Sequence, residues 1–392
     1  MRYISSDYII PVSRPPVQDG VVILEGENVI DVVNRESIGD VPTEHYQGFI
    51  LPGFINTHCH LELSHMSGLT QTGKKLIPFI SDVVKFREFD QESIRAAIEK
   101  QDSRMYKSGI QAVGDISNKV DTFDQKLKSK IRYYTFVEMF DFMQDSLFEA
   151  TVEKYRNIFS ALKLKEGDGK SLVPHAPYSV SPGLFQFINK ANPDNRIISI
   201  HNQETTDEIS LFVDGSGGFK AFFEGFGFSM DFFQPTGKSS LYYALQHMNA
   251  GCKTLFVHNT LTSKKDIEAV ENWSDKSYWV TCPNANLYIE NRLPDYSAFL
   301  NQSSRMTIGT DSIMSNWQLS IWEEIKTIKK FQSYVPLKNL IEWATINGAK
   351  ALGFDKEMGS IEKGKSPGLV HIDTTWRGEE TNIQNSASSR II

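Results

Sequence analysis

Two histidines separated by one residue, His58 and His60, follow the apolar run Leu51-Pro52-Gly53-Phe54-Ile55. Such a run is typical of a buried β-strand, and residues two apart in a strand project to the same face. Neutral imidazole is the commonest protein metal ligand, so two imidazoles that point together are the beginning of a zinc-type site. A histidine pair of this kind also occurs as an ordinary hydrogen-bonded polar pair, so its interpretation depends on the rest of the chain.

Other polar side chains with the same chemistry stand at the ends of later β-rich runs. They are His175, His201, His258 and Asp311, and Glu204 follows His201 by three residues. Five of the nine histidines therefore fall at predicted strand ends. Chance placement would scatter them through helices and loops, so we expect these strand ends to face one common mouth.

Together these residues predict a site for one divalent metal ion. The predicted ligands are His58, His60, His201 and Asp311. This nitrogen-and-oxygen set suits Zn²⁺, with Fe²⁺ as the alternative. Water on such a cation has its pKa lowered to about 7, which makes hydroxide available at neutral pH. Glu204 is then placed to move a proton, and His258 to bond the attacking water or the developing oxyanion.

Each of these side chains also has a purely structural interpretation. Asp311, in Gly-Thr-Asp-Ser, could cap a turn or a helix, and Glu204 could be solvated. His175 lies between two prolines, where it could contact substrate or form a strand-end hydrogen bond. Glu62 and His65 lie in the loop after His60, where they could reach substrate or face solvent.

The elements that must position these residues form a repeating pattern between residues 53 and 311. Predicted strands cover 53–60, 109–117, 132–140, 171–180, 196–203, 254–259, 278–283 and 305–311. Amphipathic segments, including 147–162, 239–248, 264–273 and 319–331, lie between or after them. Eight strand-then-helix units predict an α/β fold of the (β/α)₈ barrel type over residues 50–354. Catalytic groups in such barrels stand at the carboxyl ends of the strands.

The two ends of the chain show a different pattern. Residues 1–49 hold short alternating strands with a Gly-Glu-Asn hairpin signal, and this part is too small to bury a core unaided. We expect the short strands of residues 355–392 to return and complete that sheet. Between the fifth and sixth barrel strands, the Gly- and Phe-rich segment 205–238 is either a lid over a planar ligand or an ordinary insertion.

Composition and charge predict a soluble, intracellular protein. The formal net charge is −7 and the pI about 5.8, with no Lys/Arg cluster, so nucleic-acid binding is not expected. The first residues show no charged-then-apolar leader, and no apolar run approaches the length of a membrane span. Three scattered cysteines, Cys59, Cys252 and Cys282, fit a reducing compartment. We therefore expect a cytoplasmic protein with a small-molecule substrate, and leave homodimer formation open.

The order of these motifs resembles the amidohydrolase superfamily, and within it the aminohydrolase branch that includes purine and nucleoside deaminases, aminodeoxyfutalosine deaminases and triazine chlorohydrolases. The resemblance rests on the segments 51–60, 175–179 and 359–365 and covers nearly the whole chain. It implies a metal-bearing barrel with a small β-sandwich built from both chain ends. It also implies the ligand set given above, Glu204 as proton shuttle, His258 beside the hydroxide, and His175 on the substrate.

The resemblance also bears on metal count and reaction. Binuclear relatives use a carboxylated lysine at a mid-barrel strand end. Residues 133–140 and 173–179 contain no lysine, so one metal is favoured, although Glu138 could bridge two.

The implied reaction is hydrolytic deamination of an amino-substituted heteroaromatic ring, such as a purine or nucleoside. The alternatives are cleavage of another C–N, C–O or C–Cl bond, or a non-catalytic binding barrel. The loop Leu61-Glu62-Leu63-Ser64-His65 is closer to aminodeoxyfutalosine deaminases than to nucleoside deaminases, which leaves the substrate open.

Overall fold

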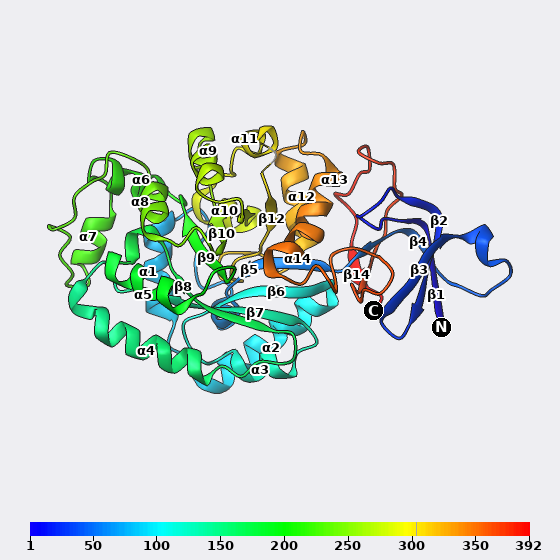
Figure 1. The fold of residues 1–392 in the computed structure, drawn as a ribbon, viewed down its shortest axis with the longest axis horizontal. Coiled ribbons are helices and arrows are strands. Elements are labelled where there is room, and N and C mark those ends of the chain that lie inside the picture. The colour runs from blue at the N-terminus through cyan, green and yellow to red at the C-terminus, as the bar shows by residue number, and fades with distance from the viewer. Residues whose placement is uncertain (303) are drawn as a thin grey trace.

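The computed structural model describes residues 1–302 and 304–392, and its larger part is a barrel of parallel strands surrounded by helices (Figure 1). The barrel strands are β5 (Phe54–Cys59), β6 (Ile110–Ser117), β7 (Arg132–Met139), β8 (Gly169–Pro174), β9 (Ile197–Asn202), β10 (Lys253–His258), β11 (Ser277–Thr281) and β12 (Met306–Ile308). They form two four-stranded arcs, β5-β6-β7-β8 and β9-β10-β11-β12. The predicted (β/α)₈ fold is confirmed.

Backbone hydrogen bonds at the carboxyl ends of the strands join the two arcs. The amide of His201 donates to the carbonyl of His175 at 2.9 Å, which links β9 to the end of β8. On the other side, the amides of Thr310 and Asp311 both donate to the carbonyl of His58 at 3.0 Å. Because the arcs meet at these residues, barrel closure also brings the predicted ligands together.

Helices cover the outside of the barrel, and their apolar faces pack on the strands. They are α1 (Leu76–Phe86), α2 (Gln91–Lys107), α3 (Phe123–Lys128), α4 (Phe148–Ala161), α5 (Pro182–Ala191), α6 (Thr206–Val213), α7 (Phe219–Glu224), α8 (Ser240–His247), α9 (Lys264–Trp273), α10 (Pro283–Glu290), α11 (Tyr296–Asn301), α12 (Ile321–Phe331), α13 (Leu337–Ala344) and α14 (Ile346–Leu352). Short 3₁₀ turns cover Arg35–Ile38, Leu61–Met66, Asp145–Leu147 and Pro177–Ser179. Helix α12 is an example of such an apolar face: Ile321, Ile325 and Ile328 recur at helical spacing and are all buried.

The segment 205–238 contains two short helices followed by irregular chain. Helix α6 begins directly after β9, and α7 carries Phe219 and Phe223, which are both buried. The ring of Phe228 stacks on Phe142 with 5.0 Å between their centroids. Phe228 therefore packs this segment against the loop after β7.

Both chain ends contribute to one small β domain beside the barrel, where the termini lie close together (Figure 1). Its strands are β1 (Arg2–Ile9), β2 (Val17–Glu25), β3 (Asn28–Asn34), β4 (Glu44–Pro52), β13 (Leu369–Ile372) and β14 (Ser388–Arg390), in the order β14-β13-β4-β1-β2-β3. Strand β4 pairs as far as Pro52, so residues 50–52 belong to this sheet and lead directly into β5. Gly53 allows this passage, because a Cβ there would lie 2.6 Å from the carbonyl oxygen of Pro367.

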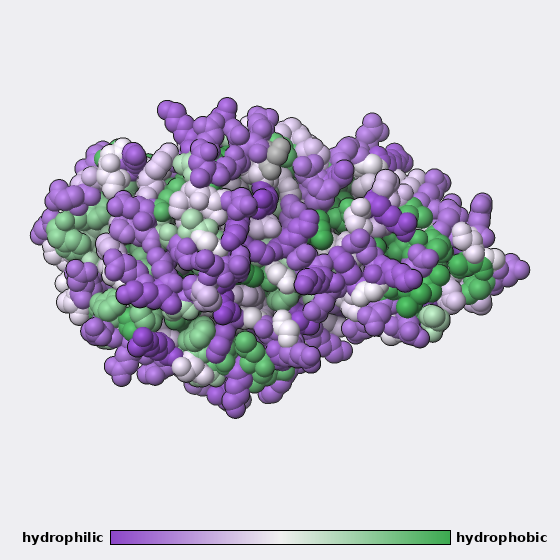
Figure 2. Space-filling view, in the orientation of Figure 1, coloured by the Kyte–Doolittle hydropathy of each residue, from purple (hydrophilic) through white to green (hydrophobic). Residues whose placement is uncertain are grey.

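The surface is mostly hydrophilic on the face drawn in Figure 2, with apolar side chains gathered over the small β domain. A separate apolar cluster, which includes Ile4, Val22 and Ile50, forms the interior of that domain. None of the helices in the described part of the chain has the length and apolar character needed to cross a membrane.

Candidate functional site

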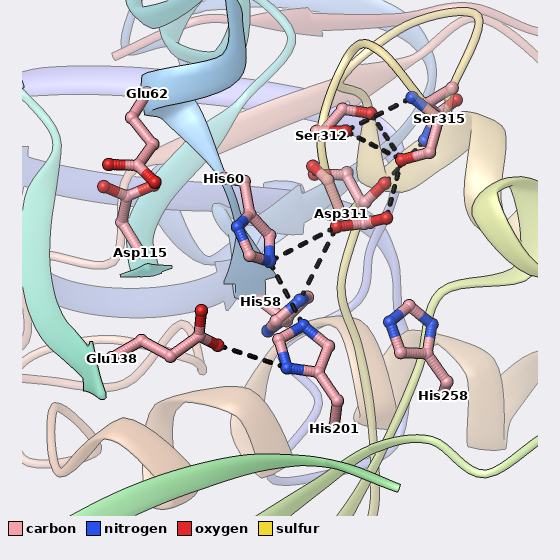
Figure 3. A network of polar contacts seen from close by, with 12 residues as sticks. His58, His60, Glu62, Asp115, Glu138, His201, His258, Asp311, Ser312 and Ser315 are labelled. Carbon is pink, nitrogen blue, oxygen red and sulfur yellow. Dashed lines mark hydrogen bonds and ion pairs between the residues drawn. The ribbon is translucent and has the colours of Figure 1, made fainter. Parts of the chain in front are cut away.

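The predicted ligands meet at the carboxyl rim of the barrel (Figure 3). His60 Nε2 lies 3.2 Å from His201 Nε2, and the Nε2 atoms of His58 and His60 each lie 3.6 Å from Asp311 Oδ1. One ligand atom from each of His58, His60 and His201 can be chosen so that all three lie within 4.8 Å of one another. The side chains come from β5 and the residue that follows it, from β9 and from the loop after β12, so residues up to 253 positions apart in the sequence converge here.

Local backbone geometry makes this convergence possible. Gly309 lets the chain after β12 approach β5, because a Cβ there would lie 2.8 Å from His58 Cβ. Asp311 adopts φ +58°, a left-handed conformation that is costly for a non-glycine residue and is common at functional sites. Ser315 Oγ then donates to Asp311 Oδ2 at 2.6 Å, which fixes that oxygen and turns Oδ1 toward the histidines.

The electrostatics of the cluster fit a bound cation. Burial lowers the pKa of His58 to about 4 and of His60 to about 3, so both keep a free lone pair at neutral pH. Burial alone would raise the pKa of Asp311, but the neighbouring imidazoles hold it below its usual range, so the carboxylate is charged. Neither ring nitrogen of His58 has a hydrogen-bond partner among the described residues, although both are buried. A divalent cation would bind the lone pair of His58 Nε2, which faces Asp311, so the residues present fit a metal ion.

Glu138 orients one of these histidines. His201 Nδ1 lies 3.2 Å from Glu138 Oε1 and 2.9 Å from the carbonyl oxygen of His175. A proton on Nδ1 donates to the His175 carbonyl beside the Glu138 carboxylate, and Nε2 points at His60. Burial lowers the pKa of His201, but the Glu138 carboxylate outweighs it and raises this pKa to about 10. A proton on Nε2 therefore competes with a cation for the same lone pair.

Glu204 and His258 stand beside the ligand set. Burial raises the pKa of Glu204 to about 8, and its Oε2 lies 3.5 Å from His258 Nε2. His258 Nδ1 lies 2.9 Å from Asn286 Oδ1, while Asn286 Nδ2 donates to the carbonyl of His258 at 3.3 Å. The amide orientation of Asn286 places the proton of neutral His258 on Nδ1, so Nε2 can accept a proton or hydrogen bond. Glu208 accepts from the Glu204 amide at 2.9 Å and holds the backbone in place.

A cavity of about 420 Å³ opens directly over this cluster. Its wall includes His60, His201, Glu204, His258 and Asp311, and otherwise consists mainly of apolar and aromatic side chains. The aromatic part includes Phe140, Phe142, Tyr178, Phe222, Phe223, Phe226 and Phe228. A planar organic ligand with few polar groups suits such a wall.

The three predicted substrate contacts differ in position. His175 lies on the cavity wall, and its Nδ1 bonds Ser179 Oγ at 2.7 Å, which leaves Nε2 available to a ligand. Glu62 and His65 are not among the described residues of that wall. Glu62 is buried and bonds the side chain of Arg87, and His65 Nε2 lies 3.2 Å from the carbonyl oxygen of Arg87.

Sequence reasoning missed the partners that orient the predicted residues. Asn286, Ser315 and Arg87 belong to segments whose position depends on how the loops fold. Asn286 had a weak signal, since it follows the predicted strand 278–283 by three residues. Nothing in the sequence pattern marks Arg87, which lies 27 residues beyond His60 in the connection between α1 and α2.

Comparison with known proteins gives a consistent result. A model of the amidohydrolase family matches residues 49–392. The chain is 27% identical over 331 residues to an adenosine deaminase of Helicobacter pylori, covering 82% of this chain and 78% of that protein. It is also 27% identical over 373 residues to an aminodeoxyfutalosine deaminase of Nitratiruptor sp., covering 91% of this chain and 88% of that protein.

Solved structures share the fold at lower identity. An aminofutalosine deaminase of Helicobacter pylori in complex with methylthio-coformycin superposes with a TM-score of 0.82 at 20% identity, and both chains are covered completely. A zinc-containing atrazine chlorohydrolase of Arthrobacter aurescens superposes with a TM-score of 0.75 at 15% identity, over 99% of this chain and 92% of that one.

Proposed function

The chain belongs to the amidohydrolase family, and we propose that it is a metal-dependent deaminase that hydrolyses the exocyclic amino group of a heteroaromatic ring of the purine or nucleoside type. The proposal rests chiefly on the position of Glu204. Its buried carboxyl group lies next to the four proposed ligands but is not one of them. Relatives aligned over most of the chain, which carry the names adenosine deaminase and aminodeoxyfutalosine deaminase, support it.

His58, His60, His201 and Asp311 would hold one divalent metal ion, and we propose Zn²⁺. Three neutral imidazoles and one carboxylate are donors that zinc accepts, and they leave a coordination position for a small molecule. When bound, such an ion acts as a Lewis acid that lowers the pKa of a water molecule to about 7. Protein side chains carry out the proton transfers and orient the reactants.

Glu204 moves the protons. In its ionised form it accepts a proton from the attacking water, and in its neutral form it donates that proton to the ring nitrogen next to the amino-bearing carbon. A pKa raised to about 8 by burial keeps both forms accessible near neutral pH, which suits a group that must accept and release one proton in each turnover. The hydroxyl group that water has added to the ring carbon then gives up its proton, which Glu204 passes to the amino group. The C–N bond breaks, ammonia leaves, and the oxygen stays on the ring carbon as a carbonyl.

His258 orients the attacking water, since Asn286 holds its proton on Nδ1 and leaves Nε2 to accept a hydrogen bond. The aromatic wall around Phe140 and Tyr178 excludes bulk water and receives the flat ring. His175 Nε2 faces the same space and is placed to bond a substrate heteroatom.

Ammonia release from a panel of compounds tests the proposal. Purified enzyme reconstituted with Zn²⁺ should release ammonia from at least one adenosine derivative and lose this activity after chelation of the metal. A panel of amides, lactones and chlorotriazines assayed in parallel covers the other reactions known on this scaffold. Turnover of one of those compounds with no ammonia from any aminopurine would contradict the assignment.

A further inference from the structure

His60 lies one residue beyond the end of β5, so the pairing between β5 and β6 ends before it. The last paired residues of these strands are Cys59 and Asp115. Beyond them, the Asp115 side chain continues the contact, because its Oδ1 accepts from the amide of Leu61 at 2.8 Å. The carbonyl of His60, at the other end of the same peptide group, accepts from the amide of Leu63 at 3.1 Å. The peptide group between His60 and Leu61 is therefore held at both ends.

The orientation of this peptide group sets the position of the His60 imidazole. A rotation of the group changes ψ of His60 and moves the side chain relative to the other strands. His60 Nε2 lies 3.2 Å from His201 Nε2 and 3.6 Å from Asp311 Oδ1. Metal ligands have to be held within about 0.5 Å of their working positions, so a small rotation here would take His60 out of the ligand set.

A buried lysine holds the Asp115 carboxylate in turn. Lys126 Nζ pairs with Asp115 Oδ2 at 2.5 Å, and the two side chains are 3% and 0% exposed. The same ammonium group donates to Ser117 Oγ at 3.0 Å and to Thr135 Oγ1 at 3.1 Å, so each of its three hydrogens has an acceptor. A buried ion pair is costly unless both charges are well hydrogen-bonded, and this pair meets that condition. Lys126 thus fixes Oδ2 and leaves Oδ1 to Leu61.

This ion pair lies outside the space where a substrate would bind. Neither Asp115 nor Lys126 is among the described residues of the cavity wall. Figure 3 shows Asp115 next to Glu62, on the other side of His60 from Asp311. The pair therefore acts on the site only through the backbone that carries His60.

We propose that Asp115, held by Lys126, is a positioning residue that fixes His60 through the Leu61 amide and so raises the affinity of the site for its metal ion. The inference rests on the metal site of the proposed function. A purely structural ion pair would stabilise the fold without acting on His60, so the two roles can be separated. Groups that orient a metal ligand typically contribute about 10–100-fold in metal affinity.

Two double variants separate these roles. Asp115→Asn with Lys126→Met and Asp115→Leu with Lys126→Met both remove the buried ion pair, but only the first keeps an oxygen for the Leu61 amide. Ser117 Oγ, 3.4 Å from Asp115 Oδ2, can accept from the introduced amide and keep that oxygen toward Leu61. Competition with a zinc-binding dye should show a loss in affinity of about 10–100-fold with leucine and less than about threefold with asparagine.

The ion pair between Glu323 and Lys326 in α12, at 2.8 Å, provides the matched control. Glu323→Gln with Lys326→Met should bind zinc as wild type does. Thermal unfolding of each metal-free variant measures the loss of stability separately from the loss of affinity. Equal zinc affinities in the two Asp115 double variants, whether unchanged or lowered together, would overturn the positioning role.

The hydrogen bond is also observable in the wild-type protein, which keeps the proposal testable if the variant with leucine does not fold. His60-Leu61 is the only His-Leu pair in the sequence, so labelling with carbonyl-¹³C histidine and ¹⁵N leucine gives one signal in an HNCO spectrum. Its amide proton should lie downfield of most leucine amides, exchange slowly with solvent, and shift when zinc is added. A rapidly exchanging amide proton at an ordinary leucine position would overturn the proposal.

Zinc binding by the wild-type protein is measured first. Its absence would contradict the metal site itself. Normal zinc binding by wild type, together with an unaffected variant with leucine, would contradict only the role of Asp115.

Discussion

At the scale of single residues, the site works by assigning each proton to a defined atom. Asn286 holds the His258 proton on Nδ1, and Glu138 with the His175 carbonyl does the same for His201. His258 Nε2 then carries a lone pair toward the centre of the site, whereas the raised pKa of His201 leaves a proton on its Nε2 that a bound cation would displace. Glu204 Oε2 lies 3.5 Å from His258 Nε2, and burial raises the pKa of Glu204 to about 8, so its proton is exchangeable near neutral pH.

Glu204→Gln separates proton transfer from metal binding. The amide keeps the shape of the side chain but cannot accept a proton, so kcat should fall by about 10²–10⁴-fold. The metal content should stay at the wild-type level, since Glu204 lies outside the ligand set. Rates near those of wild type, measured by ammonia release, would remove Glu204 from its proposed role.

Glu138→Gln tests the orientation of His201. Loss of the carboxylate removes the charge that makes this ligand more basic, and such changes typically weaken metal affinity by about 10–100-fold. Competition with a zinc-binding dye measures the affinity directly. Glu153→Gln, at an exposed position of α4, is the control and should bind zinc as wild type does. An unchanged affinity in the Glu138 variant would show that Glu138 does not support the ligand.

At the scale of elements, the sequence contained most of what positions the ligands. Apolar runs ending in histidine predicted β5, β9 and β10 because buried parallel strands leave a strong pattern, and α9 lies at its predicted bounds. Loop conformation left no such pattern. The positive φ of Asp311 and the path that carries Arg87 to the cavity depend on contacts between distant segments, so the residues after α1 could not be placed in advance.

Phe226 and Phe223 both line the cavity but differ in burial within the segment 205–238. Phe223 is fully buried, so Phe223→Ala should lower the free energy of unfolding by about 3–5 kcal/mol. Phe226 lines the cavity but is 43% exposed, so Phe226→Ala should cost far less stability and should raise KM. Denaturant unfolding and steady-state kinetics measure both effects. Equal stability losses in the two variants would contradict this division.

At the scale of the whole molecule, the metal site and the fold are coupled. The ligands come from both arcs of the barrel, so a cation that binds all of them stabilises the closed barrel relative to the unfolded chain. The small β domain is also connected to the site, since β4 continues through Gly53 into β5, which carries His58 near its carboxyl end.

Removal of the metal should therefore lower thermal stability. Ligand binding to the native state stabilises it by about 2.7 kcal/mol when free ligand is at 100 times Kd. Scanning calorimetry should show a lower Tm after chelation and recovery after one equivalent of Zn²⁺ is added. Asp311→Asn, which weakens the ligand set, should show a smaller recovery at the same zinc concentration. A Tm that changes neither on chelation nor on addition of zinc would contradict the coupling.

The most direct test of the central claim is anomalous X-ray scattering from crystals of the zinc-loaded protein, with data collected on both sides of the zinc absorption edge. The account predicts one anomalous peak per chain, within bonding distance of His58, His60, His201 and Asp311. A peak held instead by Glu138 and His175, or no peak at the barrel rim in protein shown to contain zinc, would contradict it.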